Sequence, residues 1–120
     1  MVAKARQERA DVLVGVRHLS DVSRYGRVEV SGTRIVRFTE KGVGGPGLIN
    51  SGIYVVRRSV FEGRAPGSKF SFEQGILVPG VWDYSIRAHE ISGMFIDIGV
   101  PSDYEQAQVV IPRWAGRIEE

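Results

Sequence analysis

The sequence contains no cysteine, and its two histidines, His18 and His89, lie far apart in the chain. Without cysteine, a chain can form neither a disulfide framework nor a cysteine-ligated zinc site, and it has no thiol nucleophile. Two separated histidines also argue against a histidine metal cluster. These absences exclude the disulfide scaffolds, the zinc fingers and the cysteine-dependent enzymes.

Long hydrophobic runs and massed charges are absent too. No apolar run approaches the roughly 18 residues that a membrane-spanning helix needs. Residues 1–10 are polar and lack the apolar core of a secretory signal. We therefore expect a cytoplasmic protein with no membrane partner. The 16 basic and 14 acidic residues are interspersed, so we expect no nucleic-acid partner either.

What the chain does have is the composition of a globular domain. Its 120 residues are 42% hydrophobic and 25% charged, which fits a single domain over 1–120 and excludes a disordered chain. The 15 glycines gather at turn positions, and this favours a fold rich in strands and tight turns.

Hydrophobic patterning predicts a mixed α/β fold in which strands are the majority. The run VLVGVRHL is almost wholly apolar and fits a strand covered on both faces, whereas GRVEV and TRIVRF alternate and fit a hairpin around Ser31 and Gly32. Pro101 fits the first position of a helix. Strands are expected at 12–19, 26–30, 33–38, 48–56, 86–91 and 94–98. Helical segments are expected at 3–10, 58–62, 71–78 (ended by Pro79 and Gly80) and 101–111.

Two of these strands are apolar enough to be central strands of the sheet, namely VLVGV and GIYVV. The chain has too few helices to cover both faces of a parallel sheet. Either the sheet is antiparallel, or covering elements are missing from this polypeptide. In the second case we expect exposed strand surface to be hidden by self-association, so that the chain forms a homo-oligomer.

Asp97 is an acidic residue inside the apolar strand FIDIG. A carboxylate there is costly unless it is paired or bound to a cation. The alternative is that Asp97 points outward while its apolar neighbours point inward. Glu40 and Lys41 form an adjacent acid and base that could bind a sugar hydroxyl and a phosphate, although a solvated pair fits the spacing as well.

Asn50, Ser51 and Gly52 stand together in the strand LINSGIYVV. Buried Asn and Ser side chains need hydrogen-bond partners, and either a ligand or neighbouring backbone can supply them. A glycine inside a strand often marks close approach by another group. The glycine-rich stretch 42–47 is not a Walker loop, because no Gly-Lys-Ser/Thr follows it.

The order of five segments resembles the second half of the sugar-1-phosphate nucleotidylyltransferases, and within them the mannose- and heptose-1-phosphate guanylyltransferases. The segments are RYGRVEV, RFTEKG, LINSGIYVV, SFEQGILVP and MFIDIGVPSDYEQAQ, and the resemblance runs from about residue 1 to residue 109. It implies an α/β fold, a mixed β-sheet with flanking helices that forms part of the nucleotide-diphospho-sugar transferase (Rossmann-like) fold.

The resemblance also implies roles for individual residues. Asp97 matches one of two carboxylates that bind Mg²⁺ in the family. The implied reaction is attack of a sugar 1-phosphate on the α-phosphorus of a nucleoside triphosphate, which is GTP in the guanylyltransferases, with release of pyrophosphate. The residues that match the family's sugar-phosphate site are Tyr25, Gly26, Glu40, Lys41, Asn50 and Gly52.

Three features of the family are not found. The sequence has no Gly-Gly-x-Gly-Thr-Arg loop for the triphosphate and no earlier Gly-Asp for the other Mg²⁺ ligand, and Gly42 stands where the family often has proline. We therefore expect a chain that is inactive alone. Either it is cut from a longer gene, or it works with a separate nucleotide-binding half. The alternative is a non-catalytic module that binds a sugar phosphate or serves oligomerisation.

Overall fold

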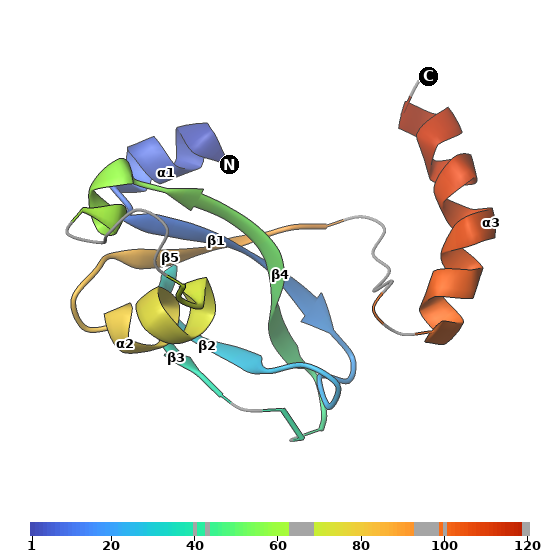
Figure 1. The fold of residues 1–120 in the computed structure, drawn as a ribbon, viewed down its shortest axis with the longest axis horizontal. Coiled ribbons are helices and arrows are strands. Elements are labelled where there is room, and N and C mark those ends of the chain that lie inside the picture. The colour runs from blue at the N-terminus through green and yellow to red at the C-terminus, as the bar shows by residue number, and fades with distance from the viewer. Residues whose placement is uncertain (40, 43, 63–68, 93–98, 100, 119–120) are drawn as a thin grey trace.

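The computed structural model describes residues 1–39, 41–42, 44–62, 69–92, 99 and 101–118. Strands form most of its body, and short helical segments flank them (Figure 1). The strands are β1 (Val12–Leu19), β2 (Arg27–Ser31), β3 (Arg34–Phe38), β4 (Gly47–Val56) and β5 (Ile86–Glu90). The helical segments are α1 (Val2–Glu8), η1 (Arg58–Phe61), η2 (Glu73–Leu77), α2 (Val78–Gly80) and α3 (Pro101–Ile118).

The five strands form one sheet that closes on itself in the order β1-β4-β2-β3-β5. β1 pairs with β5 in parallel, whereas the other strand pairs are antiparallel. The expected mixed sheet with flanking helices is therefore confirmed. The predominance of antiparallel pairing explains how so few helices suffice, because antiparallel strands need not be covered on both faces.

β1 is the central strand, as its apolar sequence predicts. It lies between β4 and β5, and residues 12–16 are all buried. Every second side chain of β1 enters the main core, as the alternation of a strand requires. The buried residues of this core are Val12, Val14, Val16, Val28, Ile35, Val60, Ile76, Leu77, Val81 and Ile86.

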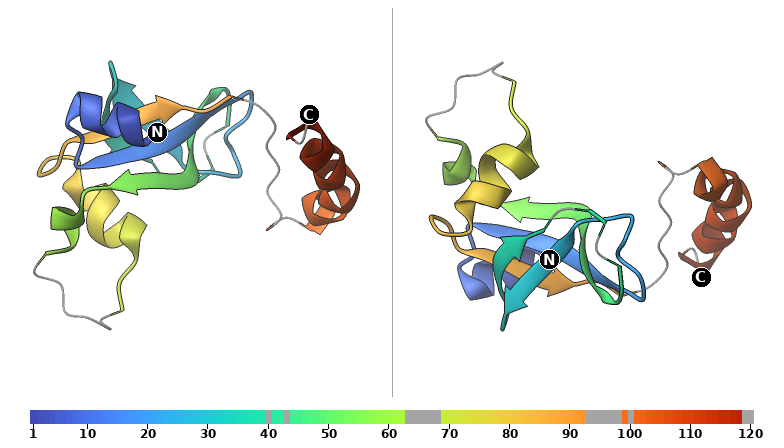
Figure 2. Two further views of the ribbon diagram at one scale, coloured as in Figure 1. Left: turned by 90° about the horizontal axis from the view of Figure 1, so that it is seen from above. Right: turned by 90° about the horizontal axis from the view of Figure 1, so that it is seen from below.

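The helical segments lie on two sides of the strands. Figure 2 shows α1 and the η2–α2 segment on opposite sides of the β1–β4 pair. α3 lies to one side of the sheet in both Figure 1 and Figure 2, and its Asp103 carboxylate pairs with the Arg24 guanidinium at 3.4 Å. On β4, Ile53 keeps 52% of its surface exposed, so this strand is less covered than its sequence predicts. In the described part of the chain, no helix is long and apolar enough to cross a membrane.

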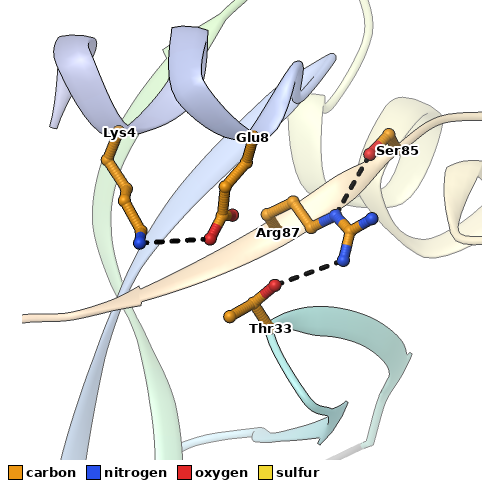
Figure 3. Close-up of polar contacts among 5 residues, drawn as sticks. All are labelled: Lys4, Glu8, Thr33, Ser85 and Arg87. Carbon is orange, nitrogen blue, oxygen red and sulfur yellow. Dashed lines mark hydrogen bonds and ion pairs between the residues drawn. The ribbon is translucent and has the colours of Figure 1, made fainter.

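The sheet closes where β3 meets β5, through the paired residues Arg34 and Arg87. Two like charges opposite each other would destabilise the pair. Their guanidinium groups instead bind different acceptors. Arg34 donates to the Val81 carbonyl at 3.4 Å. Arg87 donates to the hydroxyls of Ser85 and Thr33 at 3.3 and 3.2 Å (Figure 3). The closing contact is thus held by side chains as well as backbone.

The pairing of β1 with β4 contains an irregularity. Val14 faces Tyr54 and Val16 faces Asn50, so two steps along β1 correspond to four steps along β4. β4 bulges between these pairs, and a bulge bends a strand and redirects its side chains. Gly52 lies in the bulge with a φ of 81°, a conformation that glycine adopts without strain.

Gly15 is the β1 residue opposite the bulge. Its carbonyl accepts a hydrogen bond of 2.6 Å from the Ser51 hydroxyl, so the protein backbone is the partner of this serine. The close approach that we expected at Gly52 occurs at Gly15 instead. No atom lies within 4 Å of a Cβ built on Gly52, whereas a Cβ on Gly15 would lie 2.5 Å from the Ile91 side chain.

Helix ends differ most from the expected bounds. Pro79 and Gly80 do not end the helical segment but belong to α2, its last turn. Proline is tolerated there because the first positions of a helical turn need no backbone donor. α3 likewise runs on to Ile118 with Pro112 inside it. The strand expected at 94–98 lies outside the described residues.

Substitution of Gly15 by alanine is expected to destabilise the fold by about 1–3 kcal/mol, because the added methyl overpacks the junction of β1 with Ile91 and Ser51. Urea unfolding monitored by circular dichroism measures the change. Gly75→Ala is the matched control, since a Cβ there meets Phe70 at an ordinary 3.5 Å and the residue is helical. It should be neutral or stabilising by up to about 1 kcal/mol. Equal stabilities of the two variants would contradict the tight junction.

Candidate functional site

A cavity of about 330 Å³ opens beside β2, between the end of β3, the first half of β4 and the η2–α2 segment. This volume is at the lower end of the range for small-molecule sites. Its walls combine charged, amide and aromatic groups with apolar side chains. The lining residues are Tyr25, Gly26, Arg27, Val28, Phe38, Thr39, Lys41, Asn50, Glu73, Gln74, Leu77 and Val78.

Four of the residues expected in the sugar-phosphate site line this one cavity, although they come from three separate segments: Tyr25, Gly26, Lys41 and Asn50. Gly52 does not line it, but its backbone N–H donates to Oδ1 of Asn50 at 2.8 Å. Glu40 and Asp97, the other two expected site residues, lie outside the described residues.

Glu73 and Gln74 are cavity residues that the sequence analysis did not single out. They open η2, which has the wider π-helical turn, and they share the cavity wall with Leu77 and Val78. Single π-helical turns are rare and occur frequently at functional sites. The Ser71 hydroxyl caps this segment by accepting from the Gln74 N–H at 3.2 Å. A serine at the start of the helical segment 71–78 is the local signal that could have located this wall.

Arg27 holds the glycine-rich stretch that follows Lys41. Its Nη2 donates to the Gly44 carbonyl at 3.1 Å. A Cβ built on Gly47 would lie 3.0 Å from Nε of Arg27, so a side chain at Gly47 would crowd the guanidinium. Nε of Arg27 is itself buried and makes no hydrogen bond. The glycines therefore let the backbone close around an arginine side chain.

The preceding turn, residues 21–25, supports the same stretch from the other side. The Gly45 carbonyl accepts from the Val22 N–H at 2.9 Å, and the Gly42 N–H donates to the Ser23 carbonyl at 3.2 Å. Hydrogen bonds from the Ser23 N–H and hydroxyl lower the pKa of Asp21, so its carboxylate is ionised at neutral pH. The described residues of 42–47 are thus tied to two neighbouring segments.

A metal site is not formed by the described residues alone. No three His, Cys, Asp or Glu side chains gather among them in a way that could hold a cation. Among the described residues that line the cavity, Glu73 is the one carboxylate, and Mg²⁺ is usually bound through carboxylates and phosphate oxygens. The described part of the site is therefore suited to binding a polar organic ligand rather than a metal by itself.

The chain is similar to known proteins over most of its length. Residues 1–112 match the family model for nucleotidyl transferases. The chain belongs to the nucleotidyl transferase family. It is 35% identical over 100 residues to the D-glycero-alpha-D-manno-heptose 1-phosphate guanylyltransferase of Aneurinibacillus thermoaerophilus, and 36% identical over 104 residues to the enzyme of that name from Campylobacter jejuni.

The solved structure of HddC from Yersinia pseudotuberculosis has the same fold as this nucleotidyl transferase chain, with a TM-score of 0.71 and 33% identity. The matched region covers 89% of the present chain but only 48% of HddC. The bacterial guanylyltransferases are matched over 83% and 86% of the chain and over 44% and 47% of their own lengths. The nucleotidyl transferase chain thus spans less than half the length of these relatives.

Replacing Arg27 with methionine should free residues 42–47 of this nucleotidyl transferase chain, because the bond to Gly44 is lost. Endoproteinase Lys-C is then expected to cut after Lys41 several times faster, since local opening exposes the backbone there. Mass spectrometry of the fragments measures the rate. Arg58→Met, at an exposed position of η1, is the control and should leave the rate unchanged. Equal cleavage in both variants would show that Arg27 does not hold the loop.

Proposed function

We propose that this chain binds a sugar 1-phosphate, a heptose or mannose derivative, in the cavity beside β2. The observation that carries the proposal is the convergence of Tyr25, Gly26, Lys41 and Asn50 on one cavity. The names of the relatives, heptose 1-phosphate guanylyltransferases, supply the substrate class. Glu40 and Gly52 are proposed to complete the sugar contacts.

The chemistry of the walls supports a ligand with one anionic end and several hydroxyls. Lys41 supplies an ammonium group, a compact cation that suits a phosphate. Asn50 offers amide donors and acceptors for sugar hydroxyls. Gly26 is also constrained, because a Cβ there would lie 2.6 Å from the Thr39 carbonyl oxygen. The backbone of the turn can therefore approach closely where any larger residue would not fit.

We further propose that the whole reaction, guanylyl transfer to the sugar phosphate with release of pyrophosphate, needs a nucleotide-binding half in addition to this chain. The sequence has no triphosphate loop of the family type. Asp97 would contribute one Mg²⁺ ligand, and the family pattern requires a second carboxylate. Bound Mg²⁺ would neutralise phosphate charge during the transfer. The residues of this chain would bind and orient the sugar phosphate, and the chain alone would be inactive.

A thermal-shift titration with heptose 1-phosphate and mannose 1-phosphate tests the binding. A ligand that binds only the folded chain raises its melting temperature by mass action. At a ligand concentration of 100 times the Kd, the folded chain is stabilised by about 2.7 kcal/mol. Lys41→Ala should abolish most of the shift because the phosphate loses its cation. Lys69→Ala removes a lysine outside the cavity and should preserve the shift.

The outcomes separate clearly. A shift with a sugar phosphate and none with GTP would support a sugar-phosphate half-site. The absence of any shift, or a full shift in Lys41→Ala, would exclude the proposed site.

A second proposal, association with another chain, rests on exposed apolar side chains. Tyr104 and Val109 on α3 keep 53% and 56% of their surfaces exposed, and Ile53 on β4 keeps 52%. We expect sedimentation equilibrium to show self-association that weakens in a Val109→Asp variant, because a charge at an apolar contact is costly. Glu105→Asp, also on α3, should have no effect. A monomer at all concentrations would refute self-association and leave the nucleotide-binding half as the candidate partner.

A further inference from the structure

The bulge in β4 brings together two side chains that a regular strand would separate. Asn50 and Tyr54 are four residues apart, which is about 13 Å along an extended strand. Their partners on β1, Val16 and Val14, are only two residues apart, or about 7 Å. Nδ2 of Asn50 consequently reaches the Tyr54 hydroxyl and donates to it at 2.6 Å.

The side-chain amide of Asn50 is held at both of its ends. Its Oδ1 accepts from the Gly52 N–H at 2.8 Å, and its Nδ2 donates to Tyr54. A backbone N–H can only donate, so the oxygen of the amide must face Gly52 and the nitrogen must face Tyr54. The two bonds therefore fix which way the amide is turned.

Two hydrogen-bonding positions of Asn50 remain for a ligand. A primary amide has two N–H donors and an oxygen with two lone pairs. Among the described residues, one donor and one lone pair of Asn50 have partners, which leaves one of each at a residue that lines the cavity. A neighbouring donor and acceptor match two adjacent hydroxyl groups, one of which accepts while the other donates.

Tyr54 is itself held in place from two directions. Its ring packs edge-to-face on Phe72 with centroids 4.8 Å apart, and its hydroxyl donates to Oε1 of Glu73 at 3.5 Å. Burial of the phenol, opposed by the bond from Asn50 and reinforced by the Glu73 carboxylate, raises the pKa of Tyr54 above its ordinary value. The hydroxyl is therefore protonated at neutral pH and can accept from Asn50 while donating to Glu73.

We infer that Tyr54 is a positioning residue for substrate recognition: it orients the Asn50 amide so that the cavity selects a ligand with adjacent hydroxyl groups. Tyr54 is not among the residues that line the cavity, so it acts through Asn50. The inference rests on the proposed function, because it assumes that Asn50 contacts the sugar. It adds the residue that sets the orientation and the diol chemistry that this orientation favours.

A double-mutant cycle tests the inference in the full chain. Affinity for mannose 1-phosphate is measured by calorimetry in the natural chain, Tyr54→Phe, Asn50→Ala and the double variant. Phenylalanine keeps the ring that packs on Phe72 and removes only the hydroxyl. We expect Tyr54→Phe to weaken binding roughly threefold to tenfold, the range for one hydrogen bond. In the Asn50→Ala background the same change should have almost no effect, because residues that act as a unit are not additive.

Two further measurements separate orientation from a loss of structure. Tyr54→Phe should leave the affinity for inorganic phosphate unchanged, since that ligand has no diol. It should also move the side-chain amide resonances of Asn50 in the ligand-free chain, because their hydrogen-bond partner is gone. Tyr84→Phe, at a half-buried tyrosine that is not among the residues lining the cavity, is the control and should alter none of these quantities.

The inference and the proposed function fail in different ways. If the natural chain binds mannose 1-phosphate but Tyr54→Phe binds it equally well, the positioning role is wrong and the proposed function stands. If Tyr54→Phe weakens binding to the same extent with and without Asn50, Tyr54 acts independently and the inference is again overturned. If the natural chain binds neither mannose nor heptose 1-phosphate, the proposed function fails and the role of Tyr54 fails with it.

Discussion

The irregular pairing of β1 with β4 is the feature on which the candidate site depends. β4 has two more residues than β1 between the pairs Val14–Tyr54 and Val16–Asn50. The chain accommodates them through the positive φ of Gly52 and through the Ser51 hydroxyl, which binds the Gly15 carbonyl that the interrupted ladder leaves available. A regular pairing would give β4 more backbone hydrogen bonds but would move Asn50 away from Tyr54. The sheet thus gives up ladder bonds at the point where it forms the cavity wall.

A second constraint, the guanidinium group of Arg27, places the opposite part of the site. Arg27 belongs to β2, which pairs with β3 on one side and β4 on the other. Its side chain lies against the backbone of Gly44 and Gly47. Gly47 keeps that approach possible, because a side chain there would crowd the guanidinium. A glycine-rich sequence is often interpreted as a mobile loop. Here the glycines instead allow the backbone to pack directly against the charged side chain of Arg27.

The hydrophobic pattern of the sequence predicted the features that depend on neighbouring residues, above all the strands. The apolar run of β1 has the expected bounds, 12–19. Both strands of the β2–β3 hairpin begin one residue later than expected and β2 also ends one residue later, a small difference because alternation sets the strands. Convergence of Tyr25, Lys41 and Asn50 followed from the family resemblance, not from spacing. The bulge, the hold of Arg27 on Gly44 and the place of Glu73 in the wall all arise from contacts between distant segments. Hydrophobic periodicity contains no signal for such contacts, whose partners are 17 or more residues apart in the last two cases.

Under the proposed function, recognition of the sugar phosphate and transfer of the nucleotide would be physically separable in this fold. Every residue that lines the cavity lies between positions 25 and 78, and the elements that carry them pack on the core around β1. The sheet closes on itself around this core, and no described residue of α3 is among those that line the cavity. Under the proposed function, binding would be governed by Lys41 and Asn50, with Tyr54 acting through Asn50. Transfer would need the Mg²⁺ ligands and the nucleotide-binding half in addition, so a change in one need not alter the other.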